Sequence, residues 1–571
     1  MRVHCRVRGR RLDLRHAAMV SAAASTTRGA APTRRRAPAH RTWAPRLTPV
    51  AFGVLAGFSC ARGGPQSAAG PGGRTGSGST GGLGSLPDQT ITNPDGASAL
   101  NSSATTVIGG PCTGNGYNCR IDPCEGGSPT TITAKVYDPA AKNPLFNVAV
   151  YVPNTDLDPI ATGPTCDNCA TPVSGSPVAS ALTDTSGQFV MTNAPDGANV
   201  PLVMQIGKWR REITLPQVNA CQNNAFDDPS TFRLPANQSE GNIPMIALGV
   251  GGADTLECLL LRIGVSSSDF TNPGGGGRVN LFVDDIAGGA GIDTPTSSYT
   301  NGAVFPNFSS LFTSVDSIDD GGFIDSGLDP LSAYDLVMIS CQGSQAAGRA
   351  VTSAEKQGLK AFVDNGGRSF LSHYNYSWLR GGDLVDGGKE DLVPSAEGAQ
   401  IDLQTKYTLT PFPAIAVWED PATLTYAPGG DGTYLVNTSF ARGSDMALWL
   451  YDGGASTILG QIDLVNVKDP ATSAIASVAE SWIYQDASGV PYISANTPIE
   501  QAATPDAQCG RIVQTGIHVA ADVADTHDPF PSGCVTADLT PQEKALEFLF
   551  FDLSSCVTDE TQQPSPPVVP R

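Results

Sequence analysis

Cys341, His373 and His518 each lie in or directly after a short apolar run, and their side chains could carry chemistry. Cys341 closes the run in YDLVMISCQGSQ (334–345), His373 follows RSFLS, and His518 lies in GRIVQTGIHV. In an open α/β sheet, residues at the carboxyl ends of the strands face the crevice that binds ligands. A thiol and two imidazoles there could supply a nucleophile, an acid–base pair or ligands for a metal ion.

Cys341 has three interpretations: a catalytic thiol, one half of a disulfide, or a buried bystander at a strand end. His373 and His518 could be acid–base catalysts, metal ligands, or half-buried residues without a functional role. Two histidines without an assigned carboxylate make an incomplete metal site. The sequence therefore predicts no metal and no cofactor, and it leaves the role of the histidines open.

Acidic residues follow another apolar run, VNLFV. Asp284 and Asp285 come directly after it, in a ligand-facing position if the run is a strand of an open α/β sheet. The glycines that follow do not form GxGxxG, so no nucleotide site is predicted. The acidic stretch Asp316–Asp329 fails the EF-hand pattern, because Ile318 and Gly327 occupy its third and twelfth positions. We interpret that stretch as a solvated loop, with an irregular calcium loop as the alternative, and we expect His527 to be exposed in a loop.

The charge of −20 is unevenly distributed. Residues 1–60 hold 12 of the 35 basic residues and one of the 55 acidic ones, so residues 61–571 hold 23 basic and 54 acidic residues. Such an acidic chain repels phosphate backbones and anionic membranes, which excludes nucleic acid as a partner. The Arg-rich start, the apolar run Leu47–Phe58 and Cys60 have the order of a bacterial secretory signal. We expect export, with Cys60 as a candidate for lipidation and thus for the one attachment to a membrane.

An exported chain can form disulfides. With Cys5 in the signal and Cys60 lipidated, eleven of the 13 cysteines remain, so at least one thiol stays unpaired. Cys341 is expected to be that buried thiol. Cys166 and Cys169, in CDNC, are expected to form a local bridge. The disulfide candidates are Cys112, Cys119, Cys124, Cys166, Cys169, Cys221, Cys258, Cys509, Cys534 and Cys556.

Composition divides the chain into segments. Residues 1–60 are a signal segment, 61–108 a disordered Gly/Ser/Pro linker, and 109–130 a Cys-rich segment. From residue 131 to 265, short alternating runs separated by turn residues predict a small antiparallel β-sandwich. Residues 558–571 are predicted to be a disordered tail.

Residues 274–557 have a different pattern. Continuous apolar runs and helices with clear start signals predict an α/β domain with a parallel, flavodoxin-like sheet. One helix starts at the capping box Thr352-x-x-Glu355, and another at Thr540 with Pro541 at its first position and Glu543 at its third. Residues 380–505, with YTLTPFPAIAVW, GTYLVNT, MALWLY and SWIYQ, are predicted to be a β-rich insertion. The chain as a whole is therefore multidomain.

Two resemblances add to this. The order of a D-P turn, NVAVYV, TDTSGQF and an apolar strand over residues 130–215 resembles the carboxypeptidase regulatory-like (transthyretin-like) module, which implies an accessory module without catalytic residues. The segments DLVMISCQGS, FVDNGGRSFLSHYNYSW and GRIVQTGIHV resemble the class I glutamine amidotransferase-like fold, and within it the ThuA-like branch.

The second resemblance implies roles for particular residues. Active amidotransferases carry their cysteine on the elbow after the Gly-Gly strand, where this chain has Ser372 and His373. Cys341 matches an earlier turn beside the site, and His518 matches the family's histidine. The acidic partner would stand two residues later, at Ala520, and Asp522 is the nearest carboxylate.

These patterns favour an exported, tethered cell-envelope protein of binding or structural type, with an amidotransferase-like domain that lacks catalysis. Ser372, His373 and His518 are its candidate catalytic residues, and Asp284, Asp285 and Cys341 are its candidate ligand-binding residues. The expected partner is a ligand, such as a carbohydrate, or another envelope protein. The alternative is a ThuA-like secreted enzyme that acts on a carbohydrate through His373 and His518.

Overall fold

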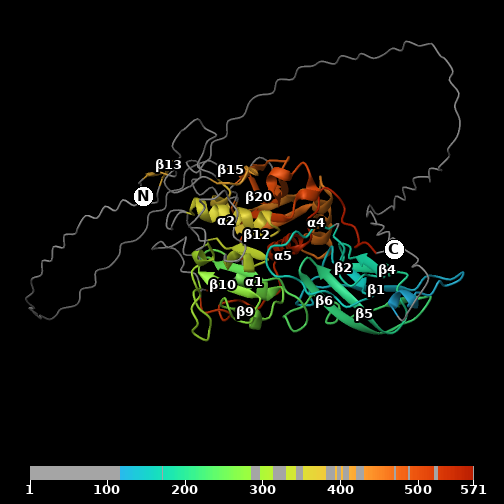
Figure 1. The fold of residues 1–571 in the computed structure, drawn as a ribbon. Helices are drawn as coiled ribbons and strands as arrows, with labels where there is room; N and C mark the ends of the chain where they lie inside the picture. Colours follow the sequence, from blue (N-terminus) through green and yellow to red (C-terminus); the bar gives the residue numbers. More distant parts are fainter. Residues whose placement is uncertain are drawn as a thin grey trace, which may run out of the picture. The chain divides into compact units, whose positions relative to one another are not determined.

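The protein is described by a computed structural model and is rich in β-sheets (Figure 1). The described residues are 116–169, 171–283, 296–312, 330–341, 351–380, 392–394, 400–402, 410–418, 430–468, 471–485, 489–519, 525–526 and 528–569. They all belong to one compact unit, residues 92–571. Within them, no helix combines the length and the apolar character needed to cross a membrane.

Two small sheets are built from the alternating runs after residue 130. The first has the order β4-β1-β7, and the second has the order β3-β2-β5-β6 with antiparallel pairing throughout. The strands are β1 (Thr131–Lys135), β2 (Ala149–Val152), β3 (Ala179–Leu182), β4 (Gln188–Thr192), β5 (Gly197–Ile206), β6 (Trp209–Val218) and β7 (Asn223–Ala225). Alternate side chains such as Ile132, Phe189 and Met191 are buried in β1 and β4, as expected of a sheet with one apolar face, whereas β2 and β5 each bury three consecutive residues. These two sheets lie in the region that the sequence predicts to be an antiparallel β-sandwich, which we call the sandwich region, although β1 and β7 pair in parallel.

A ten-stranded sheet follows, in the order β17-β16-β19-β20-β21-β12-β11-β8-β10-β9. The six strands from β21 to β9 pair in parallel. If β8, β10, β11, β12 and β21 are numbered 1 to 5 along the chain, their order across the sheet is 2-1-3-4-5, which is that of flavodoxin-type sheets. Strand β9 is added at the edge, beside β10. The parallel strands are β8 (Ile246–Val250), β9 (Phe270–Thr271), β10 (Val279–Val283), β11 (Leu336–Ile339), β12 (Arg368–Ser372) and β21 (Gly510–Thr515).

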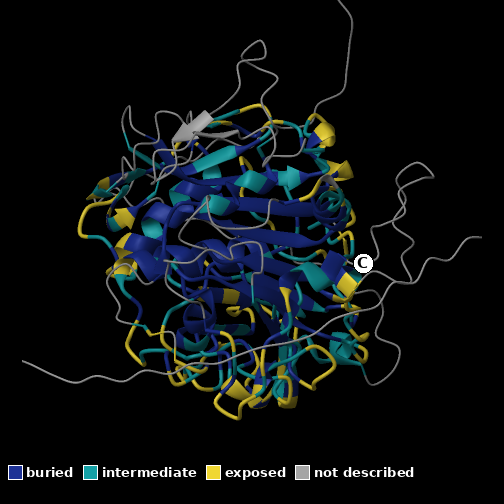
Figure 2. Ribbon diagram, turned by 90° about the vertical axis from the view of Figure 1, so that its left-hand side faces the viewer, coloured by how far each residue is buried: buried dark blue, intermediate teal, exposed yellow. Residues whose placement is uncertain are grey.

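Helices cover both faces of the parallel strands. Leu336 and Met338 of β11 belong to one apolar cluster, whereas Val337 and Ile339 belong to another. The first cluster includes α1 (Leu256–Arg262), α5 (Pro541–Ser554) and the two small sheets, and the second includes α2 (Ser353–Asp364). The parallel strands of the large sheet are almost entirely buried, which explains their continuous apolar runs, and buried strands fill the middle of the view in Figure 2. The predicted capping boxes of α2 and α5 are both formed.

Residues 380–505 differ from the predicted β-rich insertion in two ways. Four of their strands extend the large sheet as antiparallel neighbours, and MALWLY lies in a helix, α4 (Ala441–Asp452). A short apolar run fits a buried helix as well as a buried strand, which is why the sequence misled. The strands are β13 (Leu392–Pro394), β14 (Gln400–Asp402), β15 (Ala416–Trp418), β16 (Gly430–Val436), β17 (Gln461–Val467), β18 (Ala471–Ala474), β19 (Glu480–Gln485) and β20 (Gly489–Thr497).

The predicted boundary between the two regions was wrong. Strand β8 and helix α1 lie before residue 265, yet β8 pairs with β10 and β11 in the large sheet. The run IALGV is fully buried on both faces, unlike the alternating runs before it. The α/β region therefore begins about 30 residues earlier than the glycine-rich stretch suggested.

The segment after residue 557 is also not the free tail that its composition predicted. Glu560 is buried, accepts a hydrogen bond from the Ser494 hydroxyl at 2.8 Å, and pairs with Arg511 at 3.2 Å. The Ser180 hydroxyl donates to the carbonyl of Pro567 at 2.8 Å. These contacts hold the proline-rich segment against the rest of the unit.

Charged groups are buried where α5, β21 and α4 meet. The Asp552 carboxylate accepts hydrogen bonds from Arg442, on α4, and from Arg511, on β21, the latter at 2.6 Å. At the other end of α5, the Gln542 amide donates to the main-chain carbonyl of His518. Helix α5 is thus fixed to β21 at both ends by polar contacts in an otherwise apolar interior.

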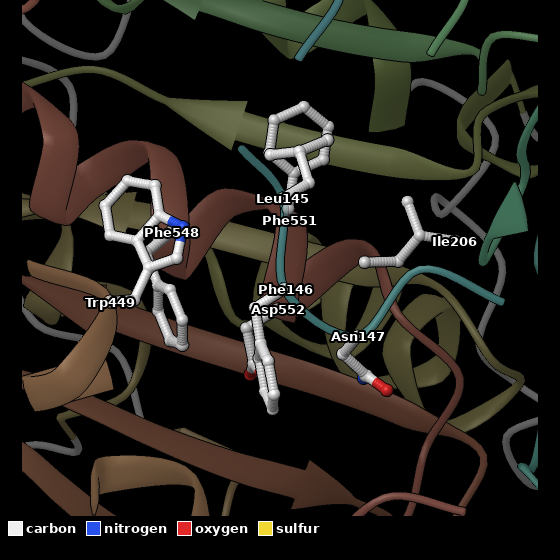
Figure 3. A pocket seen from close by; sticks show the side chains of 8 residues that line it. All are labelled: Leu145, Phe146, Asn147, Ile206, Trp449, Phe548, Phe551 and Asp552. Atoms are coloured by element: carbon white, nitrogen blue, oxygen red, sulfur yellow. The ribbon is translucent and has the colours of Figure 1, made fainter. Parts of the chain in front are cut away.

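The sandwich region packs on α5 and α4 through aromatic side chains. Phe146 stacks on Phe548 with ring centroids 5.9 Å apart, and the Trp449 indole donates to the carbonyl of Pro144 at 2.7 Å. Figure 3 shows a cavity between these groups, with Leu145, Phe146 and Ile206 facing α5. Its volume of about 10 Å³ is that of one water molecule at most, so it is a packing gap and not a ligand pocket.

Four disulfides join described residues. They are Cys124–Cys221, Cys166–Cys509, Cys169–Cys556 and Cys258–Cys534. Cys119 is also in a disulfide. The predicted local bridge within CDNC was therefore wrong. Both cysteines lie in the loop between β2 and β3. Cys166 joins this loop to Cys509, directly before β21, and Cys169 joins it to Cys556, after the end of α5.

We predict that these two long-range bridges are energetically coupled. While one remains, the other closes a loop of about 50 residues. Without it, the shortest loop runs through the Cys258–Cys534 bridge and has about 110 residues, so removing both should cost about 0.7 kcal/mol more than the sum of the single losses. Denaturant unfolding of the variants Cys166→Ser/Cys509→Ser, Cys169→Ser/Cys556→Ser and their combination measures this. Additive losses would contradict the coupling.

Candidate functional site

Cys341, His373 and His518 meet at the carboxyl ends of three adjacent parallel strands. Cys341 comes two residues after β11, His373 directly after β12, and His518 three residues after β21. The Cys341 sulfur lies 3.3 Å from Nδ1 of His373, and the two imidazole centroids are 5.2 Å apart. One donor atom from each of the three residues lies within 4.8 Å of the other two. All three side chains are buried.

The turn after β12 is held in an unusual conformation. His373 has a φ of 39°, a left-handed value that is costly for residues other than glycine. The Asn375 amide nitrogen donates to the carbonyls of Ile339, Ser340 and Ser372 at 3.0–3.1 Å. These bonds join the ends of β11 and β12, so they fix the distance between Cys341 and His373.

The strand ends approach closely on the side of β8. A side chain at Gly251 would place its Cβ 2.2 Å from the main-chain oxygen of Cys341, so only glycine fits there. The Ala253 main-chain N–H donates to the same oxygen at 3.0 Å. The position of Cys341 is thus set by the loop after β8 as well as by its own strand.

Both imidazoles are neutral at pH 7. Burial lowers the pKa of His373 well below its usual value, and His518 and Lys468 lower it further. Burial also lowers the pKa of His518 to about 4, with Lys468 as the second cause. The Tyr374 ring stacks on His373 with centroids 3.8 Å apart. Neutral imidazoles can accept a proton or bind a metal ion.

Ser372 does not join this cluster. Its hydroxyl donates at 2.6 Å to Asp254, whose other carboxylate oxygen accepts the main-chain N–H of Val519 at 2.8 Å. Burial raises the pKa of Asp254 to about 6. Asp254 therefore holds the residues next to both histidines, but among the described residues no hydrogen bond links Ser372 to either imidazole.

The sequence identified Cys341, His373 and His518 separately but did not bring the thiol to the histidines. The order of the strands supplies that link, because β11 lies beside β12 and β12 beside β21. Asp254 was missed, although it follows a buried strand. Other candidates lie outside the described residues: Cys60, Cys112, Asp284, Asp285, the whole stretch Asp316–Asp329, Asp522 and His527.

With the thiol included, the cluster offers three metal-ligand atoms where the sequence alone had assigned two. Nε2 of His518 is buried and has no hydrogen-bond partner among the described residues. The arrangement can hold a soft metal ion, or it can act as a thiol with a nearby base.

A second group of buried charges lies under α1. Arg262 pairs with Asp525 at 3.1 Å and with Glu543. Glu257 is fully buried and has an unpartnered carboxylate oxygen, and burial raises its pKa to about 8, with Asp254 and Asp525 adding to the increase. Glu257 is thus protonated at neutral pH in the folded protein.

Glu257 should make the protein less stable as the pH rises from about 4.5 to about 8. In that range the unfolded chain has lost the proton while the folded protein retains it, so the free energy of unfolding falls by up to about 1.4 kcal/mol per pH unit from this group. Glu257→Gln should remove this contribution and gain stability relative to the wild type between pH 5 and pH 8, measured by denaturant unfolding. The exposed Glu212→Gln is the control, and equal behaviour of the two variants would contradict the prediction.

No protein-family model and no curated protein matches the chain. Two solved structures that align with part of it are interface mutants of a type II cohesin–X-dockerin complex from Acetivibrio cellulolyticus. The C-terminal mutant is 14% identical over 25% of this chain and 75% of that chain, with a TM-score of 0.13. The N-terminal mutant is 15% identical over 24% and 85%, with a TM-score of 0.14. Likeness at this level carries no argument about fold or function.

Proposed function

We propose that the chain is an exported, tethered cell-envelope protein whose α/β domain binds a ligand without catalysing a reaction. The secretory signal pattern, the linker of residues 61–108 and the four described disulfides support export. The 2-1-3-4-5 strand order and the turn after β12 support an amidotransferase-like domain of the ThuA-like branch. The β-sandwich would be a carboxypeptidase regulatory-like accessory module.

One observation carries the non-catalytic assignment. The left-handed elbow position holds His373, and the thiol that an amidotransferase needs there lies instead on the neighbouring strand, at Cys341. Among the described residues, no carboxylate accepts a hydrogen bond from His373 or His518, so an orienting third group is not present in that part of the chain. The thiol and the two imidazoles of the cluster are therefore better suited to binding a ligand than to catalysing acyl transfer.

The alternative is a secreted enzyme of the ThuA-like branch that acts on a carbohydrate. Its support is the distance of 5.2 Å between the imidazole centroids of His373 and His518, together with their lowered pKa values. Two neutral imidazoles side by side could share proton transfer. The alternative lacks an orienting group, because among the described residues no carboxylate accepts a hydrogen bond from either imidazole.

The proposal is tested with the mature full-length protein and the variant His373→Gln/His518→Gln. On glutamine and on a panel of glycans and glycosides, we expect no turnover that depends on the histidines. We expect a glycan of the panel to raise the melting temperature of the wild type and to leave that of the variant unchanged. Histidine-dependent turnover would establish the alternative. Intact-mass analysis tests export separately, by reporting the mature N-terminus and any acyl group on Cys60.

A further inference from the structure

We infer that Cys341, His373 and His518 form a binding site for one copper ion in its Cu(I) state. This inference rests on the proposed function, because it names the ligand of the same cluster. One thiol and two imidazoles form a donor set that copper prefers, since thiolates select soft ions and imidazoles suit copper.

The distances suit a shared ion. At metal–ligand distances of about 2.3 Å for sulfur and about 2.0 Å for nitrogen, the 3.3 Å between the Cys341 sulfur and Nδ1 of His373 corresponds to a sulfur–metal–nitrogen angle of about 100°. The His518 donor lies within 4.8 Å of the other two, so a small movement of its ring completes a three-coordinate site. The three ligands come from three separate strand ends, and Asn375 fixes two of those ends relative to each other.

An independent observation points to an absent ligand. Nε2 of His518 is buried in a residue only 4% exposed, without a hydrogen-bond partner among the described residues. A buried polar atom without a partner costs roughly 1–3 kcal/mol. A metal ion bound through Nε2 of His518 would give this nitrogen a partner.

Charge selects a monovalent ion. Binding releases the Cys341 thiol proton to solvent, and the resulting thiolate neutralises Cu(I), whereas with Zn(II) the cluster keeps one positive charge. Lys468 acts electrostatically on both histidines and would repel that residual charge. Zn(II) also favours four ligands, and the cluster supplies three. Both effects favour Cu(I) over Zn(II).

The inference is tested by titrating the mature full-length protein with Cu(I), without oxygen, against a chromogenic Cu(I) chelator. We expect one Cu(I) per chain. Cys341→Ser and His518→Gln should each weaken binding by at least about 100-fold, more than the loss of an outer-shell partner does. Ser369→Ala is the matched control, because it alters the same strand β12 at a hydroxyl that has no hydrogen-bond partner among the described residues. Its affinity should remain within about threefold of the wild type.

Circular dichroism and melting of the copper-free variants show whether each one is folded. If Cys341→Ser does not fold, a second form of the wild type takes its place. The wild type is partially denatured, its Cys341 thiol is methylated, and the protein is refolded. The same loss of Cu(I) affinity is expected. Titration with Zn(II) should give weaker binding than Cu(I), and Lys468→Gln should narrow that difference.

Three results would overturn the copper site: no Cu(I) bound by the wild type, Cu(I) binding unaffected by the loss of Cys341, or tighter binding of Zn(II) than of Cu(I). In each case, a histidine-dependent rise in melting temperature with a glycan would leave the proposed binding function standing. Histidine-dependent turnover of a glycan would contradict the proposed non-catalytic function. The copper site would still be decided by the Cu(I) titration alone.

Discussion

The buried carboxylate of Asp552 holds together the elements on which the rest of the α/β region depends. It accepts hydrogen bonds from Arg442 on α4 and Arg511 on β21, and Arg511 in turn pairs with Glu560. Charges in such an interior are costly unless each one is matched, so these partners specify one arrangement of helix and strand. Because α5 also contacts His518 through Gln542, the same helix fixes the strand that delivers the histidine.

The cluster of Cys341, His373 and His518 depends on a second constraint, which is the meeting of parallel strand ends at one edge of a sheet. Each side chain comes from a different strand, and the loops after β8 and β12 fix the positions of these ends. Burial that makes the sheet stable also removes water from the imidazoles and keeps them neutral. The chemistry available there thus follows from the packing of the sheet.

Local signals in the sequence predicted much of the fold. Helices α2 and α5 begin at the capping boxes expected of them, and β10, β11, β12 and β21 lie where apolar runs indicated strands. The errors have a common cause, since they all concern information that is not local. The run IALGV belongs to the large sheet because of its partners, and MALWLY is helical because of its surroundings.

The candidate site shows the same division. Its histidines could be selected from their places after apolar runs, but the contact of Cys341 with His373 depends on which strands are neighbours. Asp254 was missed for the same reason, as its partners Ser372 and Val519 are more than 100 residues away in the chain. The proposed metal site became visible only when strand order supplied the third donor.

The pairing of the CDNC motif has a consequence for biosynthesis. Cys166 and Cys169 leave the ribosome long before their partners Cys509 and Cys556, which follow 343 and 387 residues later. During that interval the two thiols are closest to each other, and oxidation would join them to each other first. Reaching the native pattern then requires thiol–disulfide exchange, so production of the correctly folded chain should depend on a disulfide isomerase.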